Sequence, residues 1–436
     1  MKYIINGGQP LHGAVRLGGA KNASFKLMIA ASLADSKSRL LNLSQIGDVD
    51  ITQKTLQALG CQVSYCGERT LFIQPAPFKS VEIPQFSGEK SRASTLFASV
   101  LIAQKGEAII PHPGGCVLGE RPIDRHLDAL KSLGVKIHSD SKAIHLKAPK
   151  LIGSTYRFSK KTHTGTESFI LAAVKAQGTT VIQNAGLEPE IDDLILFLNN
   201  MGANILRQKD NIIIKGVKKL TGTIHRTMPD RNEAVSYAVA ALATQGDIVV
   251  EDAREKDLTY FLDKLNDINA GYQILDYGIR FFYQGQLKAT DIKTQPEPGF
   301  MTDWQPLWAI LMTQAQGESH IIEAVHNNRL QYTQQLNQMG AKIKLYNPPV
   351  SHPEKYYEFD QANNDQNYHA AKIIGSTTLT PQKLTVPDLR AGATLTIAAL
   401  IANGRSEIDN ISHIERGYEN LDGRLRQLGA DIQKAN

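Results

Sequence analysis

The stretch Leu133-Gly134-Val135-Lys136-Ile137 decides the fold of this chain, because the same pattern occurs five more times along it. In each copy an apolar segment with helical periodicity ends at a glycine, and a segment with strand-like alternation follows. Glycine adopts the left-handed conformation that ends many helices, so the pattern predicts a helix, a glycine turn and a strand. The other copies centre on Gly60, Gly202, Gly271, Gly340 and Gly429.

The spacing of these six glycines defines a repeat. They are 74, 68, 69, 69 and 89 residues apart. A second series steps by 72, 68, 71 and 87 residues and marks the ends of a second set of apolar helices. Both series predict six α/β repeats of about 70 residues. The second series consists of Gly106, Gly178, Gly246, Gly317 and Gly404.

The last interval is longer than the others, which predicts an insertion near Tyr346 to Thr378. Its Pro-Pro-Val-Ser-His-Pro and Asn-Asn-Asp-Gln-Asn segments are typical of surface loops. Six repeats fit two domains better than one, because a single core stops growing at about 250 to 300 residues.

The composition excludes several classes of protein. The chain has 436 residues, is 42% hydrophobic and contains three cysteines, which is too few for a disulfide scaffold. The first residues form no apolar signal region and no stretch approaches the roughly 18 apolar residues of a membrane span, so we expect a cytoplasmic protein. The net charge of +5 is mild and no lysine-arginine block occurs, which argues against nucleic-acid binding and favours a local site for an anionic substrate.

Polar residues cluster where the predicted apolar helices begin. Free amides at a helix N-terminus attract anions, and a lysine or arginine beside them would complete a phosphate or carboxylate site. Ordinary N-capping is the alternative for the carboxylates and threonines. Capping does not explain the cations, because they oppose the helix dipole, whereas a bound anion does. The clusters are Lys21-Asn22, Ser91-Arg92, Thr164 to Glu167, Asp230-Arg231, Thr302-Asp303 and Asp388 to Arg390.

The segment Pro113-Gly114-Gly115-Cys116 places a thiol on a glycine-flanked loop, five residues before Arg121. Glycines let such a loop close over a ligand, and a nearby guanidinium favours a thiolate. This is the profile of a reactive cysteine. The alternative is a small apolar side chain that fills a gap in the core.

Taken together, these and other motifs resemble, in order and spacing, the UDP-N-acetylglucosamine 1-carboxyvinyltransferases of the enolpyruvyl transferase family. The resemblance runs from about residue 3 to the C-terminus. It implies transfer of the enolpyruvyl group of phosphoenolpyruvate to the sugar 3-hydroxyl with release of phosphate, the committed step of peptidoglycan synthesis. The motifs are Gly19 to Ala23, the Gly-Gly-Cys loop, Glu188 to Ile191, Pro229 to Arg231, Thr302-Asp303, Asn328-Arg329, Asp388 to Ala391 and His413 to Glu419.

The resemblance also implies the architecture. We expect an α/β fold of two inside-out domains, each made of three βαβαββ repeats with buried central helices. The first three-repeat domain would span residues 21–229 and carry the Gly-Gly-Cys loop. The second would combine residues 1–20 with residues 230–436.

Site roles follow from the same resemblance. Cys116 matches the family's general acid at phosphoenolpyruvate C3, which fosfomycin alkylates, and Asp303 matches the carboxylate beside the sugar 3-hydroxyl, the candidate base. Lys21, which we also count among the catalytic residues, matches a residue that binds phosphoenolpyruvate. The other phosphoenolpyruvate contacts would be Arg92, Arg121, Arg390 and Arg416. Contacts to the nucleotide sugar would be Asn22, Arg92, Arg121, His126, His163, Thr164, Gly165, Asp303, Val325 and Arg329.

The expected chemistry needs one acid and one base on opposite sides of a double bond, and cations to neutralise phosphate and carboxylate. It requires no metal and no cofactor. Cys61 and Cys66 stand four residues apart without a second pair, so a zinc site there is the less favoured interpretation.

The sequence departs from the family pattern at three places. His163-Thr164-Gly165-Thr166-Glu167 replaces Ser-Val-Gly-Ala-Thr, Val235 replaces a glycine, and Asn327 replaces a glutamate. The first segment lines the nucleotide region in the family, so we expect altered nucleotide contacts without loss of the reaction. A histidine that touches the diphosphate would bind more tightly below about pH 6.5. The alternative is that His163 points to solvent.

Three other functions stay open. The sister enzyme 5-enolpyruvylshikimate-3-phosphate synthase shares the fold, but it has a Gly-Ser-Lys-Ser type start and no Gly-Gly-Cys loop. A non-enzymatic paralogue would bind nucleotide sugar without turnover. A nucleic-acid-binding protein would need clustered basic residues with interleaved aromatics, which this chain lacks.

The first prediction concerns the thiol of Cys116. Cys116→Ala should abolish turnover and labelling by fosfomycin, whereas Cys116→Asp should keep activity and resist the drug, because a carboxylic acid donates a proton but attacks an epoxide poorly. Intact-mass spectrometry measures the labelling. Fosfomycin on Cys61 or Cys66, together with a fully active Cys116→Ala variant, would contradict the assignment.

Overall fold

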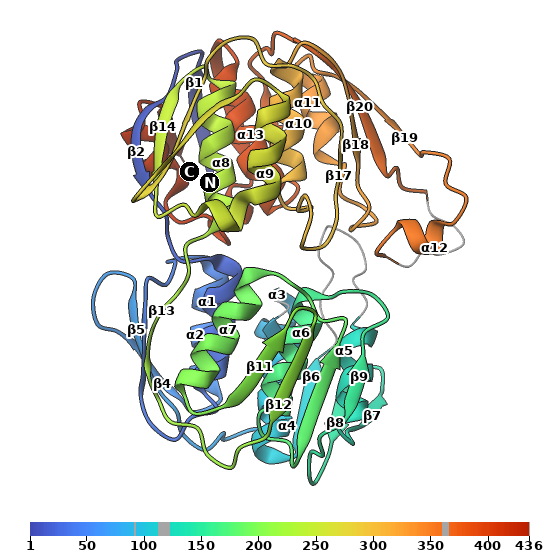
Figure 1. Cartoon of the computed structure of the whole chain (residues 1–436). Helices are drawn as coiled ribbons and strands as arrows, with labels where there is room; N and C mark the ends of the chain where they lie inside the picture. The colour runs from blue at the N-terminus through green and yellow to red at the C-terminus, as the bar shows by residue number, and fades with distance from the viewer. Residues whose placement is uncertain (91–92, 112–122, 360–365, 436) are drawn as a thin grey trace. The chain divides into compact units, whose positions relative to one another are not determined.

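The computed structural model describes residues 1–90, 93–111, 123–359 and 366–435. The chain divides into two compact units. Unit 1 comprises residues 1–18 and 229–435, and unit 2 comprises the described residues from 19 to 228. Within unit 1 the first strand pairs with the last, which brings the two termini close together (Figure 1).

Unit 2 contains three sheets around central helices (Figure 1). Its helices are α1 (Lys21–Ala31), α2 (Gly47–Ala58), α3 (Gln85–Lys90), α4 (Ala93–Lys105), α5 (Asp124–Ser132), α6 (His163–Ala173) and α7 (Pro189–Asn200). Its strands are β3 (Ser38–Leu41), β4 (Gln62–Tyr65), β5 (Thr70–Gln74), β6 (Glu107–Pro111), β7 (Lys136–Ser139), β8 (Ala143–Lys147), β9 (Thr155–Arg157), β10 (Thr179–Gln183), β11 (Asn204–Gln208), β12 (Asn211–Lys215) and β13 (Ile224–Arg226).

Unit 1 is built in the same way, also with three sheets. Its helices are α8 (Arg231–Ala243), α9 (Glu255–Asp267), α10 (Gln305–Gln314), α11 (Tyr332–Gln338), α12 (Pro353–Tyr356), α13 (Leu389–Ile401), α14 (Ser412–Glu415) and α15 (Leu421–Gln427). Its strands are β1 (Lys2–Gly7), β2 (His12–Arg16), β14 (Asp247–Glu251), β15 (Gly271–Leu275), β16 (Gly278–Phe282), β17 (Ile292–Lys293), β18 (Gly317–Ile322), β19 (Lys342–Tyr346), β20 (Ala370–Gly375), β21 (Lys383–Thr385), β22 (Gly404–Asp409) and β23 (Asp431–Ala435).

One repeat shows the construction of the four-stranded sheets, whereas the sheet β6-β8-β7 has three strands in the described chain. Strand β9, helix α6, strand β10, helix α7 and the hairpin β11–β12 follow one another, and the sheet order is β11-β12-β10-β9. The first pair, β9 with β10, is parallel, and the other pairs are antiparallel. The chain is therefore α/β, as the glycine pattern predicts, with the βαβαββ repeats that the family resemblance implies. In two repeats the first strand is distant in sequence, because β13 pairs with β3 and β2 pairs with β14.

The central helices are buried on nearly every face. In unit 1, helices α8, α10 and α13 contact one another, and in unit 2 helix α4 contacts both α1 and α6. Every residue of α8 is buried, as is all of α13 from Arg390 to Leu400. Because apolar side chains cover all sides of these helices, charged groups are accommodated mainly near their ends.

The glycine pattern is confirmed at most positions. Gly60, Gly134, Gly202, Gly340 and Gly429 all have a positive φ directly after a helix. The fourth repeat differs: Asn269 has φ 61° and takes the left-handed conformation, while Gly271 begins strand β15. At Gly271 a Cβ atom would lie 2.5 Å from the ring of Phe282, so close packing requires this glycine.

The insertion spans fewer residues than the predicted range of Tyr346 to Thr378. Strand β20 lies within the predicted range and pairs with both β18 and β19, so only the segment between β19 and β20 extends beyond the repeat. Of that segment the described part contains the short helix α12. After α12, the rings of Tyr357 and Phe359 pack against His369, with ring centroids 5.1 and 4.9 Å from the centroid of its imidazole.

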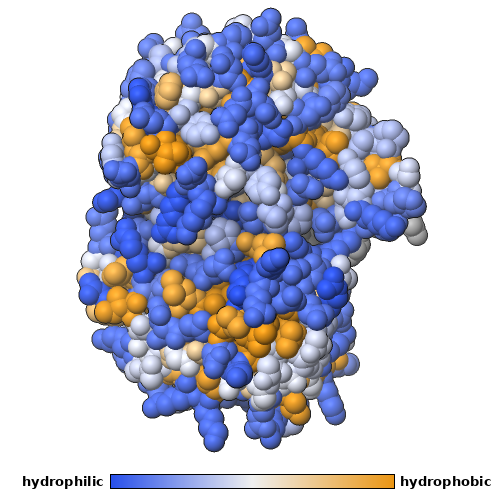
Figure 2. Space-filling view, viewed as in Figure 1, coloured by the Kyte–Doolittle hydropathy of each residue, from blue (hydrophilic) through white to orange (hydrophobic). Residues whose placement is uncertain are grey.

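The face shown in Figure 2 is mostly hydrophilic, with hydrophobic residues gathered in several separate groups. No helix in the described ranges is both long and apolar enough to cross a membrane.

The second prediction tests the buried central helices. Leu171 in α6 is fully buried, whereas Leu196 in α7 is 54% exposed, and both lie in unit 2. Leu171→Ala should lower the free energy of unfolding by about 2 to 5 kcal/mol, because it removes buried contacts and leaves a cavity. Leu196→Ala should change it by less than about 0.5 kcal/mol. Urea unfolding measures both, and equal losses would contradict the buried placement of α6.

Candidate functional site

Asp303 lies at the centre of an ion cluster in unit 1. It stands two residues before α10, and its Oδ1 accepts a hydrogen bond from Arg329 Nη2 at 2.8 Å. Its Oδ2 accepts from Arg390 Nε at 3.1 Å and lies 3.1 Å from Nη2 of the same guanidinium. Both arginine side chains are almost fully buried, while the carboxylate is 20% exposed. The two guanidinium groups favour an ionised carboxylate that a ligand can still reach.

The guanidinium of Arg390 has more N–H donors than its contact with Asp303 uses. This arginine is the second residue of α13, whose N-cap Asp388 accepts from the backbone N–H groups of Arg390 and Ala391. Burial lowers the pKa of Arg390, but Tyr418 and Asp303 outweigh this and raise it above its ordinary value. Its Nη1 is buried without a hydrogen-bond partner in the described part of the chain. A buried guanidinium N–H without a partner suits an anion.

A buried carboxyl, Glu323, shapes the turn that carries Val325. Glu323 accepts hydrogen bonds from the hydroxyls of Thr294 and Thr302 and from the backbone N–H groups of Val325 and His326. Burial raises the pKa of Glu323. Glu323 thus links the residue before Asp303 to the turn before Arg329.

Arg416, the remaining predicted residue of unit 1, directly follows the short helix α14 and is partly exposed. The position of Asn327, another departure from the family pattern, is also defined: its Oδ1 lies 3.0 Å from His369 Nε2 and accepts a hydrogen bond from Asn367. Both partners belong to the segment between β19 and β20, so the insertion contacts the turn that carries Val325 and Arg329.

Unit 2 holds a second group of predicted residues. Lys21 begins α1, and its Nζ lies 3.0 Å from Oδ2 of Asp48, which is buried in the first turn of α2. Asn22 follows it and is partly exposed. His126 is buried in the first turn of α5. Thr164 and Gly165 lie in the first turn of α6, where the hydroxyl of Thr162 accepts from the Gly165 N–H.

His163, the first residue of α6, belongs to a charged cluster. Its Nε2 lies 3.2 Å from Glu167 Oε1 and 3.0 Å from Lys26 Nζ, and Lys26 also forms an ion pair with Glu167. Lys26 and Glu167 are almost completely buried, and the His163 side chain is 18% exposed. Burial lowers the pKa of His163, but Glu167 and then Glu188 outweigh burial and Lys26, so the pKa is raised. The expectation that His163 simply points to solvent is therefore wrong.

Three predicted residues, Arg92, Cys116 and Arg121, lie outside the described residues. The structure thus groups Asp303, Arg329 and Arg390 in direct contact in unit 1. In unit 2 it places Lys21, Asn22, His126 and the start of α6 at the N-terminal ends of their helices, each described within its own unit.

Lys21 and Arg390 pair with Asp48 and Asp303, and an anion bound beside them stays a prediction. One expectation about these helix starts was wrong. Thr302 and Asp303 do not cap α10, whose N-cap is Trp304 without a side-chain hydrogen bond. Capping by Asp388 is confirmed.

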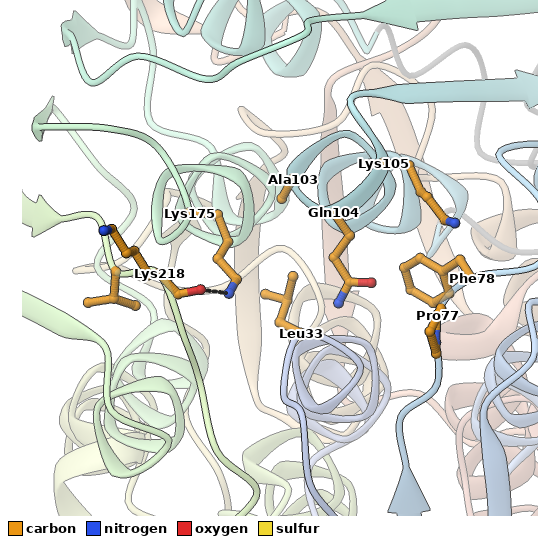
Figure 3. Close-up of a pocket in the computed structure, with 9 residues that line it drawn as sticks. Leu33, Pro77, Phe78, Ala103, Gln104, Lys105, Lys175 and Lys218 are labelled. Carbon is orange, nitrogen blue, oxygen red and sulfur yellow. Dashed lines mark hydrogen bonds between the residues drawn. The ribbon is translucent and has the colours of Figure 1, made fainter.

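A cavity in unit 2 lies elsewhere. It has a volume of about 460 Å³ and lies near the C-terminal ends of α1, α4 and α6, with Leu33, Lys105 and Lys175 in its wall (Figure 3). There Lys175 donates a hydrogen bond to the carbonyl of Lys218. The predicted residues occupy the opposite ends of these helices, so this cavity contains none of them.

Comparison with known proteins adds a second line of evidence. Residues 5–425 match the family model of EPSP synthase (3-phosphoshikimate 1-carboxyvinyltransferase). The chain is 38% identical to the UDP-N-acetylglucosamine 1-carboxyvinyltransferase of Halothermothrix orenii, over 99% of both chains. It is 39% identical to that of Chlamydia pneumoniae, over 97% of this chain and 93% of the relative. The chain belongs to the UDP-N-acetylglucosamine 1-carboxyvinyltransferase family.

Solved structures agree on the fold of this transferase family. The enolpyruvyl transferase NikO from Streptomyces tendae superposes with a TM-score of 0.87 at 22% identity, over 99% of this chain and 98% of NikO. EPSP synthase from Acinetobacter baumannii gives a TM-score of 0.73 at 17% identity, over the full length of both chains.

Sequence reasoning missed three side chains that shape the site of this family member. Asp48, Lys26 and Glu323 fix Lys21, His163 and the Val325 turn respectively. Each is buried and ionisable. For Lys26 the available signal was a charged residue among the apolar residues of α1, whereas Asp48 lies in a helix with many polar residues.

The third prediction tests the Asp303 cluster. Asp303→Ala should lower the free energy of unfolding by about 3 kcal/mol, because it removes the carboxylate that pairs directly with two buried guanidinium groups. The matched control is Asp267→Ala, whose exposed partner is Lys264, and it should cost about 1 kcal/mol or less. Urea unfolding of both variants measures the difference. An Asp303→Ala variant as stable as the control would contradict the cluster.

Proposed function

We propose that this protein transfers the enolpyruvyl group of phosphoenolpyruvate to the 3-hydroxyl of UDP-N-acetylglucosamine and releases phosphate, the first committed step of peptidoglycan synthesis. The observation that carries the proposal is the 38% identity, over 99% of the chain, with a relative of that name. The charged groups of both units fit the reaction. A cytoplasmic location and the absence of nucleic-acid partners remain predictions from the sequence.

The first step needs a base at the sugar and an acid at phosphoenolpyruvate. The sugar 3-oxygen attacks C2 of phosphoenolpyruvate and gives up its proton, while C3 gains a proton and becomes a methyl group. We assign the proton acceptance to Asp303, because its carboxylate is partly exposed and held in place by two arginines. We assign the proton delivery to Cys116 on the resemblance to the family.

The second step regenerates the double bond. The C2–O bond to phosphate breaks, C3 loses a proton, and the products are inorganic phosphate and the enolpyruvyl ether. The negative charge on the leaving phosphate and on the carboxylate must be neutralised throughout. The partnerless Nη1 of Arg390 supports a role in binding one of these anions. Lys21, Arg92, Arg121 and Arg416 are proposed as the other contacts to these two anions.

Contacts to the nucleotide sugar are proposed at the remaining predicted positions. Arg329 would hold Asp303 toward the sugar, since it donates to the other carboxylate oxygen. The Val325 turn, fixed by Glu323, would line the sugar side. Asn22, His126, Thr164 and Gly165 would contact the nucleotide part.

A phosphate-release assay with a panel of acceptors tests this proposal. We expect phosphate from phosphoenolpyruvate only when UDP-N-acetylglucosamine is present. Release with shikimate 3-phosphate instead would indicate the sister reaction. Binding of UDP-N-acetylglucosamine without any release would indicate a non-enzymatic paralogue.

The fourth prediction separates the base from the anion contacts. Asp303→Asn keeps the shape but cannot accept the proton, so kcat should fall by about 2 to 4 orders of magnitude with a modest change in KM. Lys21→Ala or Arg416→Ala should mainly raise the KM for phosphoenolpyruvate. An Asp303→Asn variant that turns over at the parent rate would assign the proton acceptance to another residue.

A further inference from the structure

The Lys26, Glu167 and His163 cluster is a feature of this chain that the proposed reaction does not yet use. It joins α1 to α6, because Lys26 belongs to the former and the other two residues to the latter. Two of its members replace Ser and Thr of the family pattern. Burying a lysine and a glutamate is costly, and a well-packed apolar pair is often equally stable. The cluster therefore calls for a functional explanation.

Both buried groups act on the same ring nitrogen. Nε2 of His163 forms a hydrogen bond with Lys26 Nζ at 3.0 Å, and it lies 3.2 Å from Glu167 Oε1 in an ion-pair contact. Nδ1 makes no hydrogen bond within the described ranges, and it is absent from the buried atoms that lack a partner. Nδ1 is thus the ring nitrogen that has no hydrogen-bond partner in the described chain and keeps some exposure to solvent.

This arrangement fixes the proton on Nδ1 in both charge states of the ring. When His163 is neutral, the ammonium of Lys26, which can only donate, makes the hydrogen bond to Nε2, and we infer that the single ring proton sits on Nδ1. When His163 is protonated, both ring nitrogens carry a proton, and the Glu167 carboxylate 3.2 Å from Nε2 supplies the nearby negative charge. An engaged nitrogen commonly sets the tautomer of the other in this way. His163 would then present an Nδ1–H donor in both charge states.

We propose that Lys26 and Glu167 are positioning residues that hold His163 as an outward Nδ1–H donor to an anionic oxygen of the nucleotide diphosphate. The ligand half of this inference rests on the proposed function, whereas the tautomer does not. His163 and Thr164 open α6, where backbone N–H groups and the helix dipole also favour an anion.

Protonation of the His163 ring strengthens its contact with the anionic oxygen of the diphosphate, but the contact does not depend on that charge. Glu167 and Lys26 face His163 directly, and Glu188, one of whose carboxylate oxygens is buried without a hydrogen-bond partner in the described chain, adds a further negative charge. The pKa of His163 is raised, so the cationic form extends to higher pH than for an ordinary histidine. Above that pKa the neutral ring still donates, so affinity for the nucleotide sugar weakens but persists.

The fifth prediction measures the tautomer directly in the unliganded protein. Nitrogen NMR of protein labelled with ¹⁵N-histidine, with His163→Gln to identify the signal, should show a neutral ring protonated at Nδ1. Free histidine prefers the proton on Nε2, so the two outcomes differ clearly. A neutral His163 protonated on Nε2 would overturn the proposal, and no variant of the cluster needs to fold for this result.

Steady-state kinetics test whether the positioned His163 contacts the nucleotide diphosphate. The double variant Lys26→Met with Glu167→Leu keeps the volume and removes both charges, which frees the ring. It should raise the KM for UDP-N-acetylglucosamine about tenfold and leave kcat and the KM for phosphoenolpyruvate nearly unchanged. The control is Lys219→Met with Asp35→Leu, an exposed pair in the same unit, which should change neither KM.

The outcomes remain separable from the proposed function. A double variant with the parent's KM for the nucleotide sugar would overturn the positioning role. A parent protein that transfers no enolpyruvyl group to UDP-N-acetylglucosamine would overturn the proposed function, while the NMR result would still decide the tautomer.

Discussion

In each unit, helices packed on all sides form the core, and this packing confines charged side chains to the neighbourhood of their ends. The constraint explains why the buried charged groups discussed above occur as compact clusters. Arg390 lies at the start of α13 and Lys21 at the start of α1, each beside a carboxylate from another element of its unit. A charge deeper in a helix requires a partner on a neighbouring helix, as Lys26 shows with Glu167.

The energetic consequence is that the clusters contribute little net stability, because ion pairing does little more than offset the loss of hydration. Removing two charges from water costs several kcal/mol per ion in a real protein, and good ion pairing roughly offsets it. Asp303 illustrates the balance: it neutralises two buried arginines while its own carboxylate stays 20% exposed. Such a group is held in place by the fold and is still available to a substrate, which is the condition for preorganised catalysis.

Much of the fold could be predicted from the sequence, because glycine turns and helical periodicity are local signals. The position of Asp388 as an N-cap was predictable for the same reason. The left-handed conformation of Asn269 was not, since asparagine and glycine compete for it and the packing of Gly271 against Phe282 decides the outcome.

The clusters could be predicted only in part, because their members are distant in sequence. Asp303 meets Arg390 across 87 residues, and Lys26 meets His163 across 137. The motifs identified Asp303, Arg390 and His163 individually, but nothing local indicated that Asp48 and Glu167 would pair with cations from other helices. Long-range pairing of this kind depends on how the repeats pack.

The central claim is that the charged ends of these helices serve transfer of an enolpyruvyl group to the sugar 3-hydroxyl. The most direct measurement is the proton NMR spectrum of the nucleotide sugar after incubation with the protein and phosphoenolpyruvate. The account predicts a pair of vinyl proton signals and a shifted proton at sugar C3 only. An unchanged sugar, or substitution at another hydroxyl, would contradict it.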